Sequence, residues 1–257
     1  MRLGLKLWST NLNYILPARE LFARKVFDYV ELFVVPGSLG LLPQWQGLPF
    51  PYVLHAPHSY AGLNPADPLR RQENLALTGE VDAYTSALSP DWVIFHPGVS
   101  GEAAESIAQF RALAARFPDM FRKALLENKP QIGMKGETCL GASPDELRAI
   151  KDGADLRFCL DFGHAICYAV AAGKPWKKVL TDFLACEPAM FHLSDGFFTV
   201  KDAHEHFGSG EYDLPFLAGC IPTDGWVSIE TKKDSADDLD DFAVDAEKLR
   251  GYARISS

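Results

Sequence analysis

Histidines and carboxylates are the side chains of this sequence whose types and placement could do chemistry. The seven histidines are His55, His58, His96, His164, His192, His204 and His206. Each ends a short apolar run or is expected in the loop just after one, and four carboxylates share that placement, namely Glu127, Asp161, Asp202 and Glu230. Imidazole and carboxylate ligands without thiolates suit Zn²⁺, Mn²⁺ or Fe²⁺. The sequence therefore predicts a metal centre.

The number of these groups indicates more than one ion. A single ion uses about four to six ligands, so we expect a cluster of two or three ions. A lone histidine at a strand end is more often a hydrogen-bonded core residue. A ligand role is better supported for Glu127 and Glu230 than for a lone histidine. Each ends an apolar run, where an unpaired carboxylate would be costly to bury.

Eight β-rich runs carry or precede these residues. The predicted strands are Leu3–Trp8, Tyr29–Val35, Tyr52–His55, Trp92–His96, Ala124–Glu127, Arg157–Asp161, Ala189–His192 and Trp226–Glu230. Most are continuously apolar, as expected for parallel strands covered on both faces. Eight strand–helix repeats predict an α/β fold, a closed (β/α)₈ TIM barrel with its chemistry at the carboxyl ends of the strands.

Amphipathic stretches separate the strands. Apolar residues share one helical face in two sets, Leu77, Val81, Tyr84 and Leu88, and Ile107, Phe110, Leu113 and Phe117. Ser143 followed by Pro144 and Glu146 predicts a capped helix start. The segment Pro36–Pro51 has little helical pattern, so the second helix is expected to be short or missing. We expect one domain over residues 1–257.

Composition is that of an ordinary globular protein, with 47% hydrophobic residues and a net charge of −9. We found no signal-like or membrane-spanning run, which predicts a cytoplasmic protein. The five cysteines are scattered, which argues against a thiolate zinc site. Leu239, Phe242 and Leu249 recur at helical spacing, so the acids around them, Asp245 included, are predicted to form the solvated face of a last helix.

Several motifs resemble AP endonuclease family 2, the endonuclease IV family within the xylose isomerase-like barrels. They begin with His-Ala-Pro at His55 and end with Ile-Glu-Thr around Glu230. Between these lie Phe95-His-Pro-Gly98, Asp161-x-x-His164 and Asp202-x-His204-x-x-x-Gly208-x-Gly210. The resemblance spans nearly the whole chain, and the order and spacing of the motifs carry it.

The resemblance implies three zinc ions and nine ligands. His55 and His96 would hold one ion, which Glu127 would bridge to a second; Asp161, His192 and Glu230 would complete the second site, and His164, Asp202 and His204 would hold the third. The family hydrolyses the phosphodiester on the 5′ side of an abasic site in damaged DNA, a DNA repair reaction in which a bridged metal pair activates water. His58, His206 and Tyr60 would then contact substrate or orient a ligand.

The chain departs from the family where DNA would bind. No Lys or Arg occurs between Lys25 and Arg70, and His58 stands where the family has a tyrosine. Because phosphate contacts supply most sequence-independent DNA affinity, a smaller phosphorylated substrate stays open beside DNA.

Two other functions also stay open. A sugar isomerase or epimerase of the same superfamily would hold one Mn²⁺, Mg²⁺ or Co²⁺ and use Glu127 and Glu230 as acid and base. That reading leaves His55, His96, Asp202 and His204 without a purpose. The third possibility is a non-catalytic metal-binding protein.

Overall fold

Eight parallel strands close into a barrel in this computed structural model, which describes residues 1–255. The strands are β1 (Arg2–Trp8), β2 (Tyr29–Phe33), β3 (Tyr52–His55), β4 (Val93–Phe95), β5 (Ala124–Glu127), β6 (Arg157–Asp161), β7 (Met190–Leu193) and β8 (Trp226–Ile229). Neighbours along the chain are neighbours in the ring, and β8 pairs with β1. The predicted (β/α)₈ TIM barrel is confirmed, and each predicted strand lies within about two residues of an observed one.

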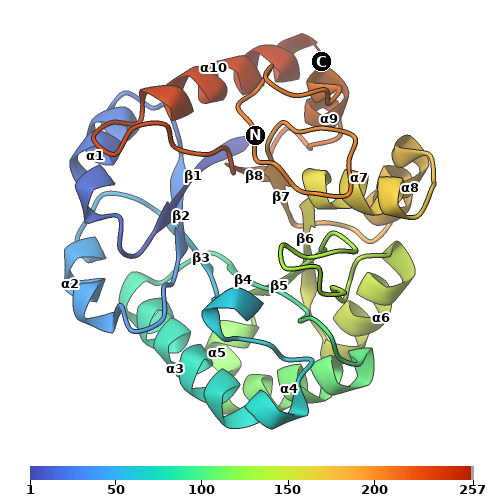
Figure 1. Cartoon of the computed structure of the whole chain (residues 1–257). Coiled ribbons are helices and arrows are strands. Elements are labelled where there is room, and N and C mark those ends of the chain that lie inside the picture. The colour runs from blue at the N-terminus through green and yellow to red at the C-terminus, as the bar shows by residue number, and fades with distance from the viewer. Residues whose placement is uncertain (256–257) are drawn as a thin grey trace.

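Helices surround the strands in Figure 1. They are α1 (Ile15–Ala23), α2 (Leu42–Trp45), α3 (Arg71–Leu88), α4 (Ala103–Arg116), α5 (Pro118–Phe121), α6 (Pro144–Ala154), α7 (Phe162–Ala171), α8 (Trp176–Leu184), α9 (Leu214–Gly219) and α10 (Asp240–Ile255). The second helix is short, as predicted. The Ser143 side chain accepts a hydrogen bond from the Glu146 amide, which is the predicted cap of α6.

The interior of the barrel is layered. Its apolar layer is Tyr29, Val53, Ile94, Leu125, Cys159 and Met190. Because side chains alternate along a strand, the residue two positions further on points into the barrel as well, one layer nearer the carboxyl end. In these six strands that residue is a histidine or a carboxylate. The alternation thus places the histidines and carboxylates in one layer, directly on the carboxyl-end side of the apolar layer.

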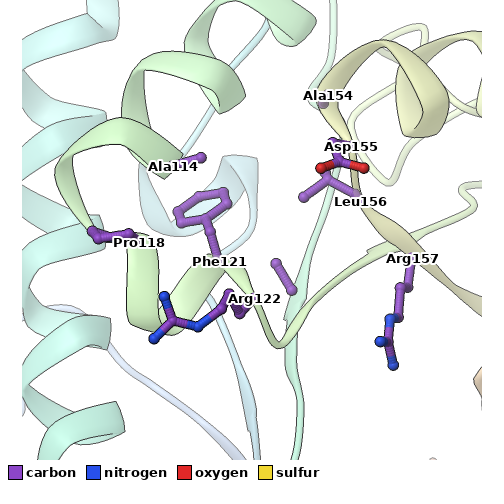
Figure 2. A pocket seen from close by; sticks show the side chains of 9 residues that line it. Ala114, Pro118, Phe121, Arg122, Ala154, Asp155, Leu156 and Arg157 are labelled. Carbon is purple, nitrogen blue, oxygen red and sulfur yellow. The ribbon is translucent and has the colours of Figure 1, made fainter.

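The opposite end of the barrel has a different character. A hollow of about 430 Å³ lies there, beside Ala124 and Arg157, the first residues of β5 and β6 (Figure 2). Phe121, Arg122 and Leu156 also line it. It contains none of the predicted ligands, so the hollow is separate from the candidate centre.

Two expectations need correction. His164 does not lie in a loop but in the first turn of α7. Asp245 does not face solvent: it is 1% exposed and accepts hydrogen bonds from His206 Nδ1 and the Phe207 amide. The last helix therefore buries one of its acids against the β7–β8 connection.

Among the described residues, no helix combines the length and the apolarity that crossing a bilayer requires.

Candidate metal centre

A ring of ionisable side chains lines the carboxyl end of the barrel. Its members, one from each strand or the residue just after it, are Lys6, Glu31, His55, His96, Glu127, Asp161, His192 and Glu230. Lys6 and Glu31 were missed by sequence reasoning, and they are register partners on β1 and β2. A signal for them existed. Each is a charged residue inside an apolar strand, and the burial argument applied to Glu127 applies equally to Glu31, which is fully buried.

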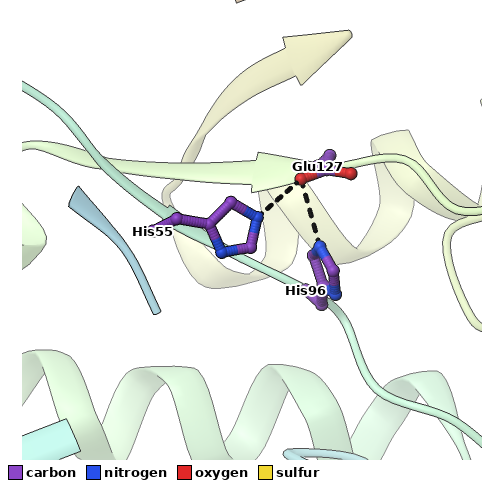
Figure 3. A group of neighbouring side chains, drawn as sticks. All are labelled: His55, His96 and Glu127. Carbon is purple, nitrogen blue, oxygen red and sulfur yellow. Dashed lines mark hydrogen bonds and ion pairs between the residues drawn. The ribbon is translucent and has the colours of Figure 1, made fainter. Parts of the chain in front are cut away.

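His55 and His96 converge on one oxygen of Glu127. Each Nε2 lies 3.1 Å from Glu127 Oε2. Dashed lines mark the two contacts in Figure 3. Nδ1 of His55 lies 2.7 Å from the Ala56 carbonyl, to which it donates, so that Nε2 presents its lone pair to the centre. Burial lowers the pKa of His96 well below its usual value and keeps this imidazole in the neutral form that binds metals.

His164 organises a second group. Its Nδ1 lies 2.9 Å from the Asn128 carbonyl, and its Nε2 lies 3.2 Å from Asp202 Oδ2. The same Asp202 oxygen is 2.6 Å from His204 Nε2. Asp161 caps α7 by accepting a 2.7 Å hydrogen bond from the His164 amide. This cap holds Asp161 and His164 together at the end of β6.

His192 joins the centre to the unexpected pair on β1 and β2. Its Nε2 lies 2.9 Å from Glu31 Oε2, and its Nδ1 lies 2.8 Å from Glu230 Oε1 and 3.5 Å from Glu127 Oε2. The Lys6 ammonium lies 3.2 Å from Glu31 Oε1 and also contacts Glu230. Lys6 thus bridges the carboxylates that hold the two sides of His192.

These side chains fit divalent ions. In each of four groups, the ligand atoms lie within 4.8 Å of one another, namely His55, His96 and Glu127; Glu127, Asp161 and His164; His164, Asp202 and His204; and Glu31, His192 and Glu230. The buried Nδ1 atoms of His192 and His204 make no hydrogen bond of acceptable geometry. Such orphaned imidazole nitrogens beside carboxylates are what a bound cation would satisfy.

Electrostatics also favour a cation. Burial opposes protonation of His164, but the charges of Asp161 and Asp202 outweigh it and raise its pKa to about 10. Burial likewise opposes ionisation of Glu31, yet His192 and Lys6 lower its pKa to about 2. The carboxylates therefore draw positive charge into the centre, and a divalent ion would supply it in place of a proton.

Asn128 braces the centre between two strands. Its amide nitrogen donates to the Asp161 carbonyl at 3.0 Å, and its amide oxygen accepts from the Asp161 backbone N–H at 2.7 Å. Because its own carbonyl faces His164 Nδ1, this one residue couples β5, β6 and the start of α7.

The three predicted substrate-contact residues lie in different surroundings. The His58 ring stacks 5.9 Å from the His96 ring, and burial, followed by the charge of His55, lowers the pKa of His58 to about 4. Tyr60 donates a 2.7 Å hydrogen bond to Glu137. His206 is hydrogen-bonded through Nδ1 to the Asp245 carboxylate on α10, outside the ring of strands.

Comparisons with known proteins agree on the fold. The family model described as xylose isomerase-like TIM barrel matches residues 44–252. No curated protein matches the chain. A D-tagatose 3-epimerase-like protein of known structure is 21% identical, over 100% of this chain and 98% of that chain, with a TM-score of 0.73. Endonuclease IV from Thermus thermophilus is 19% identical, over 99% and 100%, with a TM-score of 0.74.

A third structure, of a Thermus thermophilus protein soaked with zinc chloride, is 21% identical over 98% of both chains, with a TM-score of 0.70. At these identities the likeness shows the barrel alone. The names span both an endonuclease and an epimerase-like protein, so the chemistry has to be argued from the side chains.

Proposed function

Because this chain belongs to the xylose isomerase-like TIM barrel family, we propose that it is a metal-dependent hydrolase of phosphate esters that holds two or three divalent ions, with zinc as the first candidate. One observation carries the proposal: the ligand groups overlap. Glu127 belongs to two of them, so neighbouring ions would share its carboxylate, as ions in a cluster do.

The residues divide into three places for ions. His55 and His96 would hold one ion and share Glu127 with the next; Asp161, His192 and Glu230 would complete the second place, and His164, Asp202 and His204 the third. Ions so placed supply activation of water and neutralisation of charge on phosphoryl oxygens. The protein's own part is to fix the ligands, through Asn128, Glu31 and Lys6.

A sugar isomerase or epimerase is the second candidate. It is favoured by Glu127, Asp161, His192 and Glu230, which all lie in the ring and suffice for one ion. The likeness to an epimerase-like barrel agrees with it. Against it stand His55 and His96, whose Nε2 atoms both face Glu127 and would have no ion to bind.

Metal stoichiometry separates the two candidates. Protein purified without chelator should carry at least two ions per chain and should hydrolyse bis-p-nitrophenyl phosphate. One ion per chain, with solvent deuterium exchanged into a sugar substrate, would establish the isomerase instead. Ions without any turnover on phosphate esters or sugars would indicate a binding protein.

Action on damaged DNA is a narrower form of the same proposal. Cleavage of a duplex with a single abasic site tests it directly. If the duplex is the substrate, its affinity should fall steeply as salt is raised, because bound phosphates release counterions.

A further inference from the structure

Lys129 is a charged side chain of this site that the proposed function leaves unused. It follows β5 two residues after Glu127, and its Nζ lies 3.7 Å from Glu127 Oε1 and 3.4 Å from His164 Nε2. The side chain is 16% exposed, so the ammonium lies at the open edge of the centre rather than in the surrounding solvent. It stands between two residues that the proposal makes ligands.

An ammonium group is an unusual neighbour for metal ligands. A divalent ion bound by Glu127 and His164 would repel it and would occupy the same carboxylate oxygens. Lys129 would then need another anion as its partner. The geometry leaves the open edge of the centre as the place from which that anion can come.

We propose that Lys129 binds an anionic phosphate oxygen of a small substrate, beside the bridging carboxylate Glu127. This inference rests on the proposed function and names the substrate class for it. Lysine is suited to the task because its ammonium is a compact point charge that pairs with phosphate without demanding a fixed planar geometry.

The charge of the whole centre agrees. Its carboxylates are Glu31, Glu127, Asp161, Asp202 and Glu230, and its ammonium groups are Lys6 and Lys129. Three negative charges remain with neutral imidazoles, and two divalent ions more than neutralise them. A loaded cluster is therefore electropositive and attracts an anion, whereas a centre with one ion stays negative and repels one.

The surroundings favour a small phosphate ester over a duplex. Three cations in the segments after β3 and β8 are engaged by carboxylates, namely Arg70 by Glu73, Arg71 by Glu105 and Lys232 by Glu205. Lys233 donates to the Thr231 carbonyl. The chain as a whole carries −9. A duplex needs several free cations along its backbone, whereas a small ester needs one beside the metals.

Inorganic phosphate binding to the metal-loaded protein tests the inference. The variants are Lys129→Met, which removes the charge, and Lys129→Arg, which keeps it. Lys135→Met is the matched control, since Lys135 lies on the same β5–α6 connection as Lys129. Its ammonium lies over the Tyr60 ring, 4.7 Å from the centre of that ring. Calorimetry gives the phosphate affinity, and metal analysis of the same samples gives the ion content.

We expect Lys129→Met to weaken phosphate binding about tenfold to a hundredfold, the usual effect of losing a charge-assisted hydrogen bond, with the ion content unchanged. Lys129→Arg and Lys135→Met should stay within about threefold of the parent. An unchanged phosphate affinity in Lys129→Met overturns the inference. So does loss of metal from Lys129→Met and Lys129→Arg alike, which would make Lys129 a support of the metal centre.

The outcome is separable from the proposed function, because phosphate binding needs no turnover. If the parent protein holds two ions but binds no phosphate, the inference about Lys129 is wrong, whereas the proposed metal cluster is still supported. If a duplex with an abasic site competes with phosphate far better than a p-nitrophenyl ester does, the inference that the substrate is a small phosphate ester is wrong.

Discussion

Nε2 of His192 lies 2.9 Å from Oε2 of Glu31, although 161 residues separate them in the chain. Nδ1 of the same ring faces Glu230 and Glu127, so an ion bound at Nδ1 would leave the imidazole proton on Nε2, beside Glu31. A carboxylate behind a metal-binding imidazole fixes its tautomer and raises its basicity.

Glu31→Gln should therefore weaken the ion held by His192 and Glu230. We expect its affinity to fall about tenfold to a hundredfold, as is typical for loss of such a partner. Competition with a chromophoric chelator measures it. Glu73→Gln, an exposed carboxylate paired with Arg70, is the matched control and should leave the affinity unchanged. Equal affinities in parent and Glu31→Gln would remove the role assigned to Glu31.

Glu127→Gln should cost both metal and activity. The amide retains the size of the side chain but offers one neutral oxygen where two ions would share a carboxylate. We expect at least one ion per chain to be lost and turnover of bis-p-nitrophenyl phosphate to fall by at least about 100-fold. Metal analysis and steady-state rates check the two effects. Retention of all ions with full activity would contradict the bridging role.

Lys6→Met should destabilise the protein more without metal than with it. Removing the ammonium leaves Glu31 and Glu230 facing each other in a buried site, where breaking an ion pair costs about 3–5 kcal/mol. A divalent ion restores positive charge there. Urea unfolding with chelator and with added zinc measures both states. The same loss of stability in both would show that no ion reaches Glu230.

The fall in stability with rising pH should disappear when metal binds. Since carboxylates raise the pKa of His164 to about 10 from 6.5, the folded chain keeps a proton that the unfolded chain has released. Chelated protein should thus be most stable below about pH 6.5 and lose this contribution as the pH rises towards about 10. Bound ions require the deprotonated imidazole, and the unfolded imidazole is also deprotonated above about pH 6.5, so loaded protein should show no such loss over that range. Melting temperatures of both forms check the difference in slope.

Much of this architecture could be predicted from local patterns. Apolar runs with helices between them locate the strands. A run such as Ala124–Glu127 predicts both a strand and the position of the charged group at its end. Lys6 and Glu31 were not predicted as site residues because they lie inside their strands and not at the ends. There the period-two alternation of side chains decides which residues point into the barrel.

The pairings between distant side chains could not be predicted from spacing. The choice of Nδ1 in His192 depends on a residue five strands away in sequence, and burial of Asp245 depends on how α10 meets the β7–β8 connection. The first is set by the closed ring of strands, and the second by the packing of a helix against a loop outside that ring.

The contact between Lys6 and Glu230 joins residues 224 positions apart, on the first and last strands of the ring. A ribosome must therefore release β8 before Lys6 can meet Glu230. Until then Lys6 has only Glu31 as its partner and the emerging chain lacks the final carboxylate. Any metal uptake at that carboxylate would therefore follow synthesis of β8, and a chain stalled before β8 could not complete the proposed site.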